Sequence, residues 1–113
     1  MTGSDVELNA VNGGVADDAG VAHGARLLAF TEAVMGDDEE RLTRERAALR
    51  AVLSPACFVD AAATIAAFNV VDRIADATGI PLDDMMLVMA GDVPAQLKLG
   101  RFASAANTPS VTR

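Results

Sequence analysis

The sequence has very few of the residues that form common catalytic and metal sites. It contains one cysteine and one histidine among 113 residues. A single cysteine excludes an internal disulfide and any Cys-x-x-Cys pair, and one cysteine with one histidine cannot form a closed zinc site within one chain. A glycine-rich phosphate loop, a Ser-His-Asp arrangement and an HExxH motif are also missing. We therefore expect no catalytic residue, no metal and no cofactor, and the sequence favours a non-enzymatic role.

Aromatic and basic residues are also scarce. There is no Trp and no Tyr, and nine Lys and Arg against sixteen Asp and Glu give a net charge of −7. Proteins that bind nucleic acids need a basic surface for the phosphates, and those that bind single strands use aromatic side chains for base stacking. These shortages exclude a nucleic-acid partner.

Long hydrophobic runs are missing as well. No apolar run approaches the roughly 20 residues of a membrane span, and the N-terminus lacks the basic and then apolar pattern of a signal peptide. We therefore expect a cytoplasmic protein with no membrane partner.

The sequence does contain much apolar surface for a short folded part. Residues 1–22 are rich in Gly, Asp, Asn and Ser and predict a disordered tail, and residues 106–113 predict a flexible C-terminal tail. The single helical domain between them, 23–105, is of a size at which one core is marginally stable. The chain is nevertheless 51% hydrophobic. We therefore expect a homo-oligomer, a dimer or higher, in which subunits bury apolar surface against one another.

All strong periodic signals in the sequence are helical. Apolar residues at spacings of three and four predict a first helix over 24–35. The second helix is expected to end at Leu53, and either Asp37, as part of a capping box, or Thr43 is the expected cap at its start.

The longest predicted helix begins after Ser54 and runs to about Thr78. Ser54 is a favoured cap and Pro55 fits the first helical position, where a missing N–H costs nothing. Gly79 supplies a left-handed residue that ends the helix, and Pro81 prevents its continuation. Because this helix is apolar on nearly every side, we expect it to be covered on nearly every side, as the central helix of the fold.

A fourth helix is predicted to begin near Asp83, followed by a short turn for which Asp92 is the expected cap. Met85, Met86 and Met89 form an apolar cluster that suits a core or a subunit interface. The predicted fold is all-α, with about four helices and a short C-terminal turn around one long central helix.

An ordered set of motifs follows the alanine-rich start of the long helix, namely Phe68-Asn69, Arg73, Ala75-Asp76 and Gly79-Ile80-Pro81. This order resembles the carboxymuconolactone decarboxylase / alkylhydroperoxidase D-like family. The flanking segments 25–56 and 97–105 (LKLGRFASA) are also similar to pieces of that family, so the resemblance covers about residues 25–105. It implies an alkylhydroperoxidase D-like helical array.

The chain departs from that family where the family's chemistry lies. The family has an earlier helix pair with a Cys-x-x-Cys motif, a nearby acid and a downstream His, whereas only the polar tail precedes residue 24 here. The resemblance therefore implies a non-catalytic oligomerisation or assembly protein that pairs with itself or with a separate redox partner chain. The alternatives are a small hydroperoxidase or decarboxylase-type enzyme whose site is completed across subunits, and a helical module that binds a small molecule.

Cys57 is the candidate thiol. It lies in the first turn of the long helix, which is a position that reactive thiols use. However, it has no resolving cysteine, and no Lys, Arg or His is next to it in the sequence. A small buried or half-buried residue is the favoured interpretation.

Asn69, Asp72, Arg73 and Asp76 form the candidate polar patch on the long helix. Their spacings of three and four place them on one face. One interpretation is the charged rim of a ligand pocket. The favoured one is a hydrogen-bonded network that fixes the register between helices or subunits, with Arg73 paired to Asp76 or to a partner's carboxylate.

Overall fold

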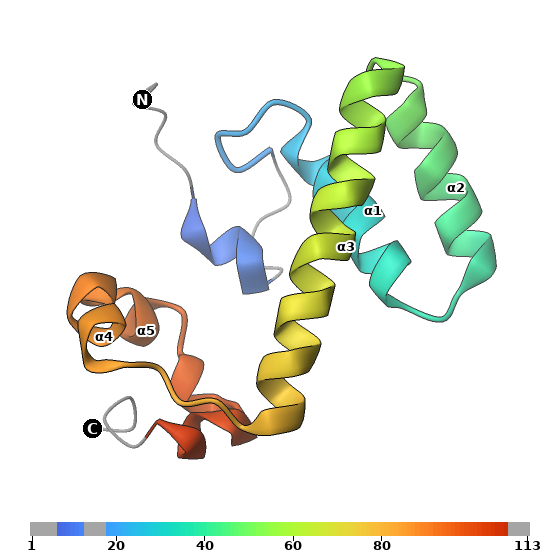
Figure 1. Cartoon of the computed structure of the whole chain (residues 1–113). Coiled ribbons are helices and arrows are strands. Elements are labelled where there is room, and N and C mark those ends of the chain that lie inside the picture. Colours follow the sequence, from blue (N-terminus) through green and yellow to red (C-terminus); the bar gives the residue numbers. More distant parts are fainter. Residues whose placement is uncertain (1–6, 13–17, 109–113) are drawn as a thin grey trace. The chain divides into compact units, whose positions relative to one another are not determined.

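Regular structure is entirely helical over the residues that the computed structural model describes, 7–12 and 18–108 (Figure 1). No strand occurs in these two ranges. The prediction of an all-α fold with one long helix is therefore confirmed. In chain order the elements are η1 (Leu8–Asn12), α1 (Gly24–Met35), α2 (Glu39–Arg50), α3 (Pro55–Thr78), α4 (Asp84–Ala90), α5 (Val93–Gln96), η2 (Leu99–Arg101) and η3 (Ala103–Asn107), where η denotes a 3-10 helix.

The chain divides into two compact units, Met1–Phe68 and Asn69–Arg113, and the division falls within α3. We describe each unit by itself. The single domain predicted over 23–105 and the tails at 1–22 and 106–113 stay predictions. Within those tails, residues 1–6, 13–17 and 109–113 lie outside the described part of the chain.

The first unit is built on a helical hairpin of α1 and α2 (Figure 1). Its core contains Phe30 and Ala33 of α1, each 3% exposed, and Leu49 of α2, which is fully buried. The first half of α3 adds the ring of Phe58, whose centroid lies 5.5 Å from that of Phe30. The predicted apolar face of the first helix thus provides the centre of this unit.

Local signals determine where the helices of this unit begin. The side chain of Asp38 accepts a hydrogen bond of 2.8 Å from the backbone N–H of Arg41 and caps α2. The prediction of Asp37 or Thr43 as the cap is therefore wrong, although Asp37 is only one residue away. At the start of α1, the Asp18 carboxylate accepts from the N–H of Ala25 at 3.1 Å.

Both ends of α3 follow the sequence prediction. At its start, Ser54 Oγ accepts from the N–H of Cys57 at 3.2 Å. At its end, Gly79 has a φ of 65°, in the left-handed region that glycine adopts without strain. The N–H groups of Gly79 and Ile80 both donate to the carbonyl of Ala75, at 2.9 and 3.3 Å, and so pair a carbonyl of the last turn.

The second unit contains the last ten residues of α3 and all elements that follow it. Among its described residues, Leu97 and Thr108 are buried, at 8% and 7% exposed. Asp83 caps α4 by accepting from the N–H of Met86 at 2.8 Å. Asp92 occupies the predicted cap position at the start of α5, but its side chain makes no cap hydrogen bond there.

The long helix α3 has no buried residue in the single chain. Its most exposed apolar side chains are 54–64% exposed. An 18-residue stretch of α3, with a mean hydropathy of 1.3 and none of its residues buried, is long and apolar enough to cross a membrane. The core helix of a soluble protein passes the same test of length and composition. The apolar side chains of α3 that are exposed at 54% or more are Val59, Phe68, Val70, Val71 and Ile74.

Candidate functional site

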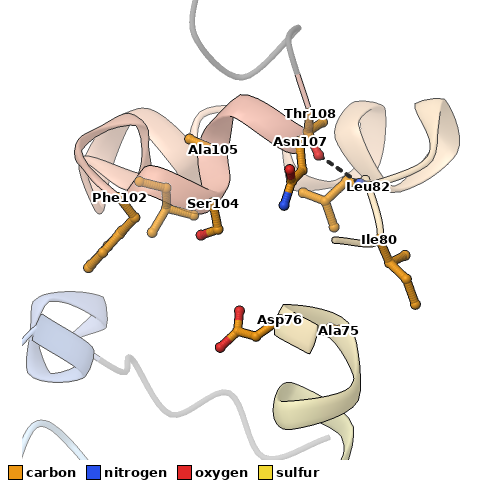
Figure 2. A pocket seen from close by; sticks show the side chains of 10 residues that line it. Ala75, Asp76, Ile80, Leu82, Phe102, Ser104, Ala105, Asn107 and Thr108 are labelled. Atoms are coloured by element: carbon orange, nitrogen blue, oxygen red, sulfur yellow. Dashed lines mark hydrogen bonds between the residues drawn. The ribbon is translucent and has the colours of Figure 1, made fainter. Parts of the chain in front are cut away.

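A pocket of about 250 Å³ lies in the second unit, at the C-terminal end of α3 (Figure 2). One wall comes from the end of α3 and the loop after it, and the other from η2, η3 and the residues around them. Most of the side chains are apolar. The residues that line it are Ala75, Asp76, Ile80, Leu82, Leu99, Phe102, Ser104, Ala105, Asn107 and Thr108.

Two local features hold these walls together. Thr108 Oγ1 accepts a hydrogen bond of 2.8 Å from the N–H of Leu82, which links residues 26 positions apart in the sequence. A Cβ added to Gly79 would lie 3.5 Å from the amide nitrogen of Asn107, so this side chain packs against the turn that ends α3. The turn after α3 and the C-terminal 3-10 segment are therefore in direct contact.

Four polar side chains interrupt the apolar lining, and one of them, Thr108, already accepts from the N–H of Leu82. Figure 2 shows the carboxylate of Asp76 on one side of the pocket, with Ser104 and Asn107 on the opposite side. Asp76 forms no side-chain hydrogen bond or ion pair with any described residue. A carboxylate accepts hydrogen bonds only, whereas a hydroxyl and an amide can donate or accept. The pocket thus offers acceptors to a ligand from two sides.

The structure separates the predicted polar patch into two parts. Arg73 Nε donates to Asn69 Oδ1 at 3.3 Å, which is the helical i, i+4 pairing. No ion pair joins Arg73 to Asp76, both of which belong to the described residues. Of the four predicted residues only Asp76 lines the pocket; Asp72 and Arg73 are exposed on α3 and Asn69 is half-buried. The functional role of the patch stays a prediction.

The candidate thiol is accessible. Cys57 is exposed and free, in the first turn of α3. His23 is exposed at the start of α1, where its φ is 59°. Among the described residues, no group of three or more His, Cys, Asp and Glu side chains could hold a metal ion.

A second cavity lies in the first unit, between the segment that precedes α1 and α1 itself. Its lining is almost entirely apolar and includes Leu8, Val21, Leu27 and Leu28. The only charged side chains among its lining residues are Glu7 and Asp18. Glu7 Oε1 accepts from Asn9, and Asp18 accepts from Ala25, so both carboxylates already have partners.

Sequence reasoning missed Ser104, Asn107 and Phe102 as members of a site. The resemblance included 97–105 only as a similar stretch, and the predicted C-terminal tail included Asn107. One signal is present, because the segment 97–105 has apolar residues at Leu97, Leu99 and Phe102, which indicates that this part of the predicted domain packs against other residues.

Comparisons of the chain with protein-family models, with curated proteins and with solved structures gave no match.

Proposed function

We propose that this chain is a non-catalytic helical assembly protein that associates with a second copy of itself through the exposed apolar face of α3. The observation that supports this proposal is the exposure of Val59, Val70 and Ile74, which are 62%, 58% and 54% exposed in the single chain. They recur on one side of α3 at spacings close to whole helical turns. Monomeric soluble proteins rarely expose large contiguous apolar patches.

The small size of the chain also favours self-association, because the single chain buries few of its described apolar side chains. Each fully buried Val or Ile side chain stabilises a fold or an interface by about 1.5–3 kcal/mol. The single chain has four buried apolar residues among those described, Phe30, Ala33, Leu49 and Leu97. A second copy that covers α3 would add several apolar side chains to this small set.

Small residues on the same face suit close helix packing. Ala63, Ala66 and Ala77 lie on the same side of the helical wheel as these exposed valines and isoleucine. Alanine lets two helix backbones approach closely, so a pair of α3 helices can bury the intervening valines.

The proposal includes two further points: the chain is similar to the second half of an alkylhydroperoxidase D-like domain, and it is located in the cytoplasm. A separate redox chain is the alternative partner for the same face. The charged side chains of α3 favour a protein partner over a membrane, because Asp60, Asp72, Arg73 and Asp76 on one helix are costly to place in lipid.

The test is the mass of the purified full chain by light scattering, for the native protein and for two matched variants. Val70→Asp places a charge on the α3 face, and Val88→Asp places the same charge on α4, where the native side chain is 81% exposed. We expect a mass of twice 11.6 kDa or a higher multiple for the native chain and for Val88→Asp, and a lower mass for Val70→Asp.

Three results would overturn the proposal. The first is a native mass of 11.6 kDa at micromolar concentration. The second is dissociation by Val88→Asp with Val70→Asp unaffected, which would move the interface to α4. The third is co-flotation of the native chain with phosphatidylcholine vesicles, which would identify α3 as a membrane segment.

A further inference from the structure

The pocket in the second unit joins an apolar lining to one carboxylate, that of Asp76, which has no partner among the described residues. Ile80, Leu82 and Phe102 contribute apolar surface and are 58%, 48% and 46% exposed. A ligand seated in the pocket would remove part of this surface from water, which favours binding in proportion to the area covered. The volume of about 250 Å³ is slightly below that of pockets for drug-sized molecules, so the ligand is small.

The electrostatics of the pocket favour a cation. Asp76 is the only charged residue among those that line it. It lies in the last turn of α3, a 24-residue helix whose carbonyl groups give this end a partial negative charge. The net charge of −7 acts in the same direction at longer range.

Arg101 adjoins the lining residue Phe102 in the sequence but does not itself line the pocket. The guanidinium of Arg101 lies 4.8 Å from the centroid of the Phe102 ring, which it stacks on. The ring of Phe102 thus already has a cation near it, whereas the Asp76 carboxylate has none within ion-pair distance among the described residues. The carboxylate is therefore the group that can recognise a charged ligand.

We infer that this pocket binds a small primary amine with an apolar body, such as an arylalkyl amine. The ammonium group donates to the Asp76 carboxylate and to the acceptor oxygens of Ser104 and Asn107, and the apolar body lies against Leu82 and Phe102. An ammonium group has three N–H donors and no acceptor, which matches acceptors placed on two sides of the pocket. This inference uses the second unit alone and is independent of self-association through α3.

The test is calorimetric titration of the full chain with three ligands of similar shape. These are phenethylamine, the neutral 2-phenylethanol and the anionic phenylacetate. We expect saturable binding of phenethylamine, with binding of the other two weaker by roughly tenfold or more, because a hydrogen bond between two charged groups is stronger than one from a neutral hydroxyl, and the anion is repelled.

Matched variants separate the pocket from general attraction to an acidic protein. Asp76→Asn and Asp72→Asn each remove one negative charge from α3, but only Asp76 lines the pocket. We expect Asp76→Asn to weaken phenethylamine binding by roughly tenfold and Asp72→Asn to leave it within about twofold. Circular dichroism of both variants checks the fold. A third variant, Ser104→Leu, fills the pocket without a change of charge, and we expect it to abolish phenethylamine binding.

Any of three outcomes would overturn the inference. One is no saturable binding of phenethylamine by the native chain. Another is equal binding of phenylacetate. The last is an equal loss of affinity in the two Asp variants, which would assign the attraction to net charge.

Discussion

The rings of Phe30 and Phe58 lie 5.5 Å apart between centroids and are tilted by 47°. This tilted arrangement is one of the geometries that aromatic pairs prefer. It joins α1 to the first half of α3, and the guanidinium of Arg50 lies 5.9 Å from the Phe58 centroid on the same ring. Phe58 therefore connects all three helices of the first unit, since Arg50 is the last residue of α2.

This connection predicts a clear loss of stability when the ring of Phe58 is removed. We expect Phe58→Ala to lower the free energy of unfolding by about 2 kcal/mol, because it removes half-buried area and the ring pair. Phe102→Ala is the matched control, since that ring is 46% exposed and lies in the second unit, and we expect a loss below about 1 kcal/mol. Urea denaturation followed by circular dichroism measures both, and equal losses would show that the ring pair does not stabilise the fold.

The start of α2 provides a prediction with a control in the adjacent residue. Asp38 Oδ1 accepts from the N–H of Arg41 at 2.8 Å, whereas Asp37 makes no cap bond. We expect Asp38→Ala to cost about 1 kcal/mol of stability and Asp37→Ala less than about 0.3 kcal/mol. The same denaturation experiment separates them, and a larger loss for Asp37→Ala would restore the cap that the sequence predicts.

The helix ends show how much the sequence could predict. Ser54 with Pro55, and Gly79 with Pro81, are local signals whose physical cause lies within a few residues of the helix end, and the structure has α3 at these bounds. The error at α2 has a local cause as well. Adjacent carboxylates are equivalent as caps in sequence, and the extended backbone of Asp38, with ψ of 98°, selects one of them.

The candidate site was only partly predictable, because it depends on contacts between distant residues. The sequence does predict Asp76, from its spacing to other polar residues on α3. Ser104 and Asn107 reach the same pocket because Thr108 bonds to Leu82, and no periodic or capping signal encodes that contact. The exposure of α3 in the single chain also could not be read from its apolar sequence, since burial depends on what packs against the helix.

The bond between Thr108 and Leu82 predicts a local opening of the pocket when it is removed. Thr108→Val keeps the shape of the side chain but removes the acceptor, and we expect a loss of about 1 kcal/mol in stability. Exchange of the Leu82 amide hydrogen should become roughly fivefold faster. Thr108→Ser keeps the hydroxyl and should show native exchange. Native exchange in Thr108→Val together with faster exchange in Thr108→Ser would mean that the methyl contact, and not the hydrogen bond, holds the segment.

The exposed thiol of Cys57 distinguishes the assembly protein from the enzyme alternative. Because Cys57 is exposed, we expect a maleimide to label it fully in the folded native chain.

The backbone N–H of Cys57 is bonded to Ser54 Oγ, and the chain contains no second cysteine to resolve an oxidised thiol. Peroxide reduction with a thiol donor should therefore stay at background for the native chain and for Cys57→Ser alike. Turnover above background that disappears in Cys57→Ser would favour a peroxidatic site completed across subunits. Turnover that persists in both would place the activity on other residues.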